Sequence, residues 1–224
     1  RESGIKTPIL VLHPQPINFE ELITNELIPS IYNFRVLTKF IETAAALSKK
    51  EYPVHIKFNT GLHRIGFDQI DIDEITNQIA KTNAIKIIAM LSHLAASEDI
   101  AEKEFTLGQI HTFKEIAQKM TDKLGYRPMF HQSNTSGILN YPEAHFDMVR
   151  TGIGLYGYGN DARYDPELKP IASLKSVISQ IHTLQAGDSL GYNRAFIATK
   201  ETKTATIPLG HADGIGRQYG NQKG

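Results

Sequence analysis

Short apolar segments alternate with helical periods through the first two-thirds of this 224-residue chain. Four segments are short, mostly apolar and bounded by polar or turn residues, as buried strands are: residues 8–12, 52–58, 85–91 and 127–131. Apolar residues recur at helical spacing along 36–47 and again along 110–124, where Gly125 follows. Alternating strands and helices imply parallel strands with right-handed crossovers, so we predict an α/β sheet or barrel.

The pattern changes near residue 160. Residues 173–184, 190–199 and 204–213 are β-rich and are separated by the turn-forming runs AGD and KETK, with no helical period between them. We therefore predict an α/β domain over residues 1–160 and the beginning of an all-β domain over 161–224. The chain starts without Met or a signal-peptide pattern and ends without completing a recognisable unit, so we expect an internal segment of a longer protein.

The composition narrows the class of partner. Lys plus Arg and Asp plus Glu both number 24, so no basic or acidic excess favours nucleic acid. The absence of cysteine excludes disulfides, thiolate nucleophiles and Cys-based metal sites. No apolar run approaches the ~20 residues that a membrane-spanning helix needs. We expect a small-molecule partner, no nucleic acid, no membrane and a cytoplasmic location.

Two segments carry most of the candidate chemistry, HIKFNTGLHRIG at 55–66 and FDMVRTGIGLYGYG at 146–159. They place Lys57 inside an apolar strand, Arg64 seven residues later and Arg150 beside a glycine run. An unpaired buried cation is costly, so Lys57 either faces a polar interior or is chemically neutralised. Glycines after Arg150 allow backbone N–H groups to approach a phosphate closely. This pattern suits an anionic, nitrogen-containing cofactor, and we expect pyridoxal phosphate.

The glycines Gly152, Gly154 and Gly157 also match the dinucleotide-binding fingerprint as a bare pattern. That fingerprint follows a first strand and opens a long helix, whereas a Tyr/Gly segment and Asp165-Pro166 follow here. The dinucleotide interpretation is therefore weak, and a simple tight turn remains an alternative.

Several histidines invite a metal-binding interpretation: His55, His63, His93, His111, His131 and His145. No HxH, HxxxH or HExxH pair occurs among them and the carboxylates are scattered, so we predict no metal site. His93 stands out because it follows a predicted strand, where polar residues of a barrel line the catalytic face. By the same argument, four other candidates are expected just past successive strands: Lys57, Arg64, Asn134 and Arg150.

These segments resemble the alanine racemase family. HIKFNTGLHRIG is similar to its H-x-K-x-[DN]-T-G-M-x-R-x-G segment, and SHLAASED at 92–99 to its THxAxAD segment. HQSNTSGILNYPEAHFDMVRTGIGLYG at 131–157 is similar to its run of N-S-A-G followed by YPEAHFDMVRPGIALYG. AGDSLGYNRAF at 186–196 and IPLGHADGIGR at 207–217 are similar to GDxVSYGRTF and IPIGYADGYxR. The resemblance covers essentially the whole chain.

The resemblance implies a partial (β/α)8 TIM-type barrel followed by an all-β domain. It implies an isomerase that uses pyridoxal phosphate to interconvert L-alanine and D-alanine for peptidoglycan precursors. It also implies a homodimer, with Tyr192 entering the partner's site as one of two bases on opposite faces of Cα. Two alternatives stay open, a non-enzymatic protein that binds pyridoxal phosphate on the same barrel and a hydrolase with metals bridged by a Lys57 carbamate.

The motif matches also imply roles for individual residues. Arg150 would face the pyridine nitrogen and, with an ordinary pKa of ~12.5, would leave it unprotonated, favouring racemisation over transamination. Arg64 would bond the phenolic oxygen, and Lys57 is the position that the family often converts to a carbamate. His93 would lie near the ring and bond toward the catalytic Tyr192. The remaining cofactor-binding residues would be Asn134, Thr135, Gly152 and Ile153.

Some positions depart from the family pattern. Thr135 stands where Ser is usual, His63 where Gly is frequent, Thr151 where Pro is usual, and His211 at a tyrosine near the substrate entrance. The family's Schiff-base lysine lies in an N-terminal AxxKAxAYGHG motif that is absent from these residues, as are its C-terminal Met-Asp loop and phosphate-binding tyrosine. We expect the intact parent to racemise alanine and residues 1–224 alone to be inactive.

Overall fold

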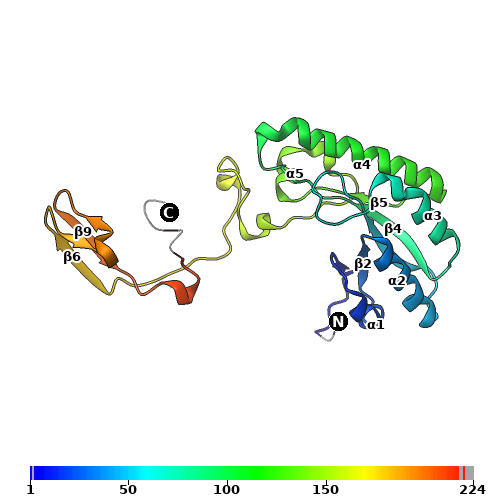
Figure 1. The fold of residues 1–224 in the computed structure, drawn as a ribbon, viewed down its shortest axis with the longest axis horizontal. Helices are drawn as coiled ribbons and strands as arrows, with labels where there is room; N and C mark the ends of the chain where they lie inside the picture. The colour runs from blue at the N-terminus through cyan, green and yellow to red at the C-terminus, as the bar shows by residue number, and fades with distance from the viewer. Residues whose placement is uncertain (2, 217–218, 220–224) are drawn as a thin grey trace. The chain divides into compact units, whose positions relative to one another are not determined.

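The computed structural model in Figure 1 describes residues 1, 3–216 and 219. The chain divides into two compact units, Arg1–Ile171 and Ala172–Gly224. The predicted α/β character belongs to the first unit and the predicted β character to the second. The end of the predicted β-domain, residues 217–218 and 220–224, and with it the last residue of the IPLGHADGIGR segment, lies outside the described residues.

A sheet of five parallel strands forms the centre of the first unit. The strands are β1 (Leu10–Val11), β2 (Ile28–Ile31), β3 (Tyr52–Lys57), β4 (Ile85–Leu91) and β5 (Met129–His131). Their order in the sheet, β1-β2-β3-β4-β5, repeats their order in the sequence. A doubly wound sheet reverses its strand order near the middle, whereas a barrel adds each strand beside the last. This topology therefore confirms the α/β prediction and is that of a half-barrel.

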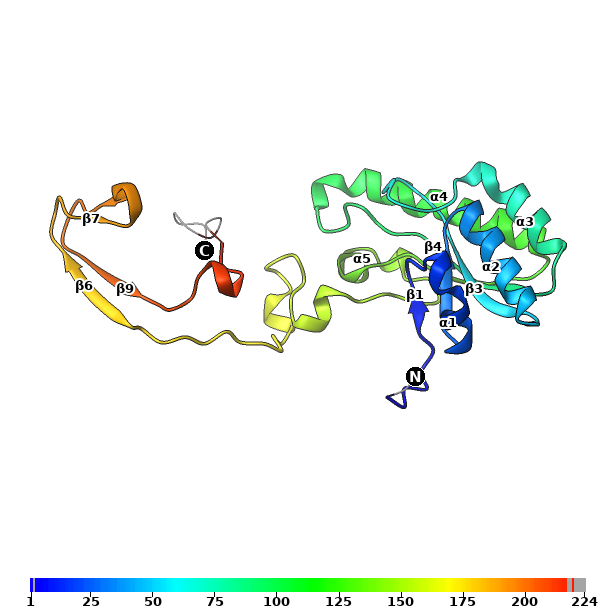
Figure 2. The same cartoon turned by 60° about the horizontal axis from the view of Figure 1, so that its bottom comes forward.

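Five α-helices accompany these strands: α1 (Phe19–Thr24), α2 (Phe34–Ala46), α3 (Ile72–Ala80), α4 (Lys103–Leu124) and α5 (Thr135–Asn140). Asn33 starts α2, since its side chain accepts the backbone N–H of Val36 at 2.9 Å. Gly125 ends α4 in the left-handed conformation, with φ of 73°. Helices α2, α3 and α4 run along the same side of the sheet (Figure 2). None of the described helices is both long and apolar enough to cross a bilayer.

The two faces of the sheet differ in chemistry. Along β3, Val54 and Ile56 are fully buried in the hydrophobic core that α2 and α4 cover. Successive side chains of a strand point to opposite faces, so His55 and Lys57 lie on the other, inward face. Both are almost completely buried there. The outer face of this strand stabilises the fold, and its inner face carries polar groups.

The strand predictions are confirmed most closely at the centre of the sheet. The segment 85–91 is β4 in full, 52–58 extends one residue beyond β3, and 8–12 and 127–131 contain the shorter β1 and β5. The sequence analysis did not predict α1, α3, α5 or β2. β2 has only four residues, and Pro29 and Ser30 at its centre interrupt the apolar run by which a buried strand is recognised.

The prediction that Arg150 follows a buried strand is wrong. Residues 146–150 form no strand. Instead, the backbone N–H of Asp147 donates to Phe130 O at 3.1 Å, and that of Arg150 donates to Ser133 O at 3.0 Å. These isolated bonds hold the segment beside β5 without a continuous ladder. Arg150 still reaches the carboxyl end of the sheet by this route.

Short strands form the second unit. β6 (Gln180–Leu184) pairs antiparallel with β9 (Thr202–Thr206), and β7 (Ser189–Leu190) with β8 (Phe196–Ile197). The β-rich prediction is confirmed for these runs. The prediction of a turn over KETK is wrong at its end, because Thr202 and Lys203 already belong to β9.

Candidate functional site

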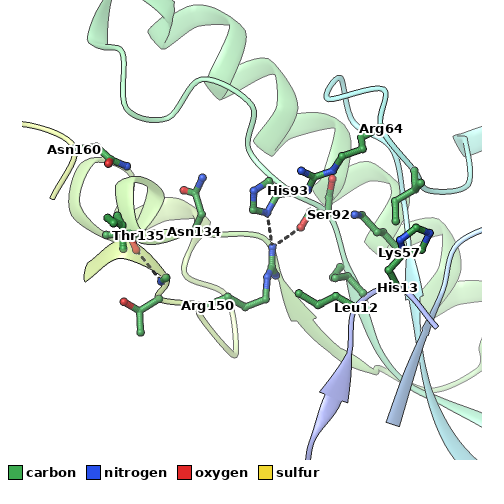
Figure 3. A pocket seen from close by; sticks show the side chains of 15 residues that line it. Leu12, His13, Lys57, Arg64, Ser92, His93, Asn134, Thr135, Arg150 and Asn160 are labelled. Atoms are coloured by element: carbon green, nitrogen blue, oxygen red, sulfur yellow. Dashed lines mark hydrogen bonds between the residues drawn. The ribbon is translucent and has the colours of Figure 1, made fainter. Parts of the chain in front are cut away.

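A cavity of about 560 Å³ lies at the carboxyl ends of the parallel strands, within the first unit. It is lined by Leu12, His13, Lys57, Arg64, Ile65, Leu91, Ser92, His93, Asn134, Thr135, Arg150, Thr151, Gly152, Ile153 and Asn160. Figure 3 shows Lys57, Arg64, His93 and Arg150 converging on this space from separate segments. Its volume suits a small molecule.

The lining is strongly electropositive. Lys57, Arg64 and Arg150 contribute to it, and none of the described residues that line it is an aspartate or glutamate. Burial, followed by the charges of Arg64 and Arg150, lowers the pKa of Lys57 to about 8. A bound anion would relieve this mutual repulsion of cations. The arrangement therefore favours a ligand that carries negative charge.

Hydrogen bonds to protein acceptors hold the guanidinium of Arg150. Nη1 lies 2.5 Å from His131 Nδ1, and Nη2 donates to Ser92 O at 2.7 Å and Gln132 O at 3.0 Å. Nη2 also lies 3.2 Å from His93 Nδ1 (Figure 3). Among the described residues, no acceptor bonds the third nitrogen, Nε. The two terminal nitrogens of the guanidinium thus fix it, and its Nε–H makes no hydrogen bond to the described residues.

The histidines around Arg150 are neutral near pH 7. Burial first, and then the charges of Arg150, Arg64 and Lys57, lowers the pKa of His93 to about 4. Burial and Arg150 also hold the pKa values of His131 and His55 well below the usual range of histidine. A neutral imidazole can accept a hydrogen bond from a guanidinium, whereas an imidazolium cannot. These shifts explain how two imidazoles tolerate direct contact with Arg150.

A second group of contacts joins the start of α5 to the segment after Arg150. The hydroxyl of Thr135 accepts the backbone N–H groups of Gly152 at 2.8 Å and Gly154 at 3.2 Å. A Cβ at Gly154 would lie 3.0 Å from Thr135 Cγ2, so only glycine fits this approach well. The side chain of Asn134 is already used, because its Oδ1 accepts Gly137 N at 2.9 Å and Ser97 Oγ at 2.8 Å.

The loop that carries Arg64 has its own supports. Asn59 Oδ1 accepts the backbone N–H groups of Gly61 at 3.2 Å and His63 at 3.0 Å. Gly66 has φ of 140°, and a Cβ there would lie 2.7 Å from Asn59 N. A side chain would therefore collide with the backbone at this turn. The loop places Arg64 at the rim, where its side chain is exposed.

The structure brings most of the predicted site residues together. The predicted lysine and all predicted cofactor-binding residues line the cavity: Lys57, Arg64, His93, Asn134, Thr135, Arg150, Gly152 and Ile153. Their contacts with a cofactor stay a prediction. Tyr192 and His211 belong to the second unit, where Tyr192 is 95% exposed and His211 is also exposed.

The sequence analysis missed the groups that hold Arg150. It considered His131 only as one of several histidines, and it did not single out Ser92 or Gln132. One signal was present, since His131 ends the predicted strand 127–131 and Lys57 lies one residue before the end of the predicted strand 52–58. In the sheet, Leu91 of the strand between them pairs with both residues. No group of three or more His, Cys, Asp or Glu residues suited to a metal occurs within the described part of the chain.

The half-barrel and its cationic cavity define the class, an α/β-barrel protein whose pocket suits an anionic small molecule. The family model "Alanine racemase, N-terminal domain" matches residues 1–160, and "Alanine racemase, C-terminal domain" matches residues 171–224. The chain belongs to the alanine racemase family. Its partial-barrel fold is that of the family, as the resemblance implied.

Known alanine racemases are similar over nearly the whole chain. The enzyme from Thermodesulfovibrio yellowstonii is 36% identical over 99% of this chain, and that from Treponema denticola is 34% identical over all of it. The structure of alanine racemase from Streptomyces lavendulae matches 99% of the chain and 59% of its own length, with a TM-score of 0.87 and 25% identity. The chain spans 57% and 60% of the lengths of the first two proteins.

Proposed function

We propose that the protein containing this chain interconverts L-alanine and D-alanine with pyridoxal phosphate. One observation carries the proposal: three cations and no carboxylate occur among the described residues that line the cavity, and one of the cations, Arg150, is fixed by neutral acceptors. This is the environment that a phosphorylated, nitrogen-containing ring requires. The 31–36% identity to curated alanine racemases supports the choice of substrate.

The chain's donor groups fit pyridoxal phosphate. Thr135, with the backbone at Gly152 and Ile153, would hold the phosphate, and glycine at 154 allows the close approach to Thr135 that a Cβ would crowd. The unused Nε–H of Arg150 would bond the ring nitrogen, and Arg64 would bond the phenolic oxygen. Asn134 and His93 would complete the cofactor's surroundings. When bound, pyridoxal phosphate draws electrons from the amino acid attached to it and makes its Cα proton acidic.

Arg150 favours racemisation because it keeps its proton. Burial lowers its pKa to about 10, which still leaves the guanidinium charged at neutral pH. It therefore donates a hydrogen bond to the ring nitrogen without transferring the proton. A ring nitrogen without its own proton withdraws fewer electrons, which limits transamination. His93, near Arg150, would bond toward the catalytic tyrosine.

Tyr192 would be one of two bases that act on opposite faces of the substrate Cα. We propose that it serves the site of the partner subunit in a homodimer and that its Oη takes the Cα proton from one face. Its near-complete exposure within its own unit supports a role in a contact with other groups. His211 would lie near the substrate entrance. The product D-alanine would supply cytoplasmic peptidoglycan synthesis.

We propose that Lys57 carries a carbamate. Its pKa of about 8 leaves a substantial fraction of neutral amine, which can add to CO2 and release a proton. The product is an anion within reach of the charges of Arg64 and Arg150, so it would replace a repulsion with an attraction. The carbamate would then orient Arg64 toward the cofactor.

Replacement of Tyr192 in the full-length protein tests the proposed reaction. We expect Tyr192→Phe to lower alanine racemisation at least about 100-fold, the usual lower range for loss of a general base. Tyr158→Phe, at another exposed tyrosine, is the matched control and should retain activity. Unchanged racemisation in Tyr192→Phe would favour the non-enzymatic alternative or another base, and absence of racemisation in the unaltered protein would refute the proposal.

A further inference from the structure

Two buried imidazoles lie in contact behind Arg150. His55 is in β3 and His131 ends β5, and they are 5% and 0% exposed. His55 Nδ1 lies 3.0 Å from His131 Nε2, and the rings meet edge to face at 67°. Strand β4 runs between them and presents Ala89 opposite His55. The small side chain of Ala89 leaves room for the two rings to meet across that strand.

Arg150 sets the direction of these hydrogen bonds. A guanidinium has only donors, so Nη1 must donate to His131 Nδ1 at 2.5 Å. In neutral His131 the proton is then on Nε2, which donates to His55 Nδ1. His55 in turn carries its proton on Nε2. One fixed donor therefore determines the tautomer of both histidines.

The opposite arrangement would be unfavourable. A proton on His131 Nδ1 would face an N–H of Arg150, leaving two donors in contact inside the protein. A doubly protonated His131 would add a second positive charge beside Arg150. Burial and that charge already disfavour protonation of both rings. The contacts therefore admit one neutral, one-directional arrangement.

We propose that His55 is a positioning residue that acts on Arg150 through His131. By accepting the Nε2–H of His131, it fixes the ring that in turn accepts from Nη1, so that the guanidinium keeps its position in the lining of the cavity. His55 is not one of the described residues that line the cavity. The inference rests on the proposed function, in which Nε of Arg150 bonds the ring nitrogen of the cofactor.

Nitrogen NMR of the full-length protein, labelled with ¹⁵N in its histidines, tests this arrangement directly. At neutral pH we expect His55 and His131 to show the neutral Nε2–H tautomer. The resonances are assigned by their loss in His55→Asn and His131→Asn. An Nδ1–H tautomer at either ring, or a doubly protonated ring, overturns the proposal. This measurement needs no substituted protein to be active.

Substitution at His55 tests its effect on its neighbours. His55→Leu removes the acceptor, and we expect His131 to lose its single tautomer and the absorption spectrum of bound pyridoxal phosphate to shift. His55→Asn retains an acceptor oxygen near the position of Nδ1, so it should restore both the single tautomer of His131 and the original absorption spectrum of bound pyridoxal phosphate. His111→Leu, at an exposed histidine of α4, is the control and should change neither. Unchanged His131 and cofactor spectra in His55→Leu overturn the proposal, and if that variant does not fold, the tautomers of the unsubstituted protein decide.

The two proposals fail separately. Absence of alanine racemisation in the full-length protein refutes the proposed reaction, but it does not change the tautomers that NMR finds for His55 and His131. Wrong tautomers refute the role of His55 even in a fully active racemase.

Discussion

The hydroxyl of Thr135 accepts the backbone N–H of Gly152 at 2.8 Å, which joins the start of α5 to the segment that follows Arg150. These residues are 17 positions apart in the sequence. Their contact holds the proposed phosphate-binding groups next to the segment that carries the proposed ring-binding arginine. Thr135 is also buried, so its hydroxyl is shielded from competing water.

Removal of this hydroxyl should weaken both the fold and cofactor binding. Thr135→Val keeps the shape but leaves the N–H groups of Gly152 and Gly154 without their acceptor, at a cost of about 1–3 kcal/mol in the free energy of unfolding. Urea denaturation and a titration with pyridoxal phosphate would measure the two effects. Thr135→Ser retains the hydroxyl and should remain close to the unaltered protein. Equal losses in the two variants would mean that the hydroxyl bond contributes nothing.

The backbone at Gly66 should not accept a side chain. Gly66→Ala puts a Cβ 2.7 Å from Asn59 N at φ of 140°, so we expect a loss of stability of about 1–3 kcal/mol. Thermal unfolding would measure it. Gly108→Ala is the control, because Gly108 is exposed within α4 and its Cβ would meet nothing within 4 Å. That variant should gain up to about 1 kcal/mol from lower unfolded-chain entropy. A Gly66→Ala protein as stable as the original would contradict the described turn.

Stability should fall as the pH is lowered from about 6.5 toward 5, the range just below the ordinary pKa of histidine. The folded-state pKa values of His93, His55 and His131 are depressed, His93 to about 4, so in this range the unfolded chain binds protons that the folded protein does not. The melting temperature across these pH values would measure the effect. His93→Gln cannot titrate and should reduce the slope by up to about 1.4 kcal/mol per pH unit. A melting temperature that does not change between about pH 6.5 and 5 would show that burial and Arg150 do not lower the pKa values of these histidines.

Lys57 should react with CO2. With ¹³C-bicarbonate near pH 8, we expect a carbamate resonance in the ¹³C NMR spectrum of the protein, because the pKa of Lys57 is lowered to about 8. Lys57→Ala should lose this resonance. Lys86→Ala is the control, because Lys86 is a more exposed lysine whose Nζ lies 3.2 Å from Glu51. A resonance that persists in Lys57→Ala would assign the carbamate elsewhere.

Sequence patterns predicted the central strands for a physical reason. The segments 52–58 and 85–91 are mostly buried and mostly apolar, so they can be recognised without knowledge of their neighbours. Strand β2 was missed because its four residues, with Pro29 and Ser30 at the centre, form no apolar run, and its place in the sheet depends on pairing with β1 and β3. Likewise, the segment before Arg150 reads as a strand by composition, yet it makes only isolated backbone bonds to Phe130 and Ser133.

The sequence by itself determined the family, the α/β class and the residues Lys57, Arg64 and Arg150, because these depend on local composition and on motifs read along the chain. Only the tertiary structure decided which groups hold Arg150. His131 and His55 are 76 positions apart, and their contact exists because β3, β4 and β5 lie side by side with a small residue between them. Hydrogen-bond direction depends on which atoms meet, and a linear pattern of residues does not contain that information.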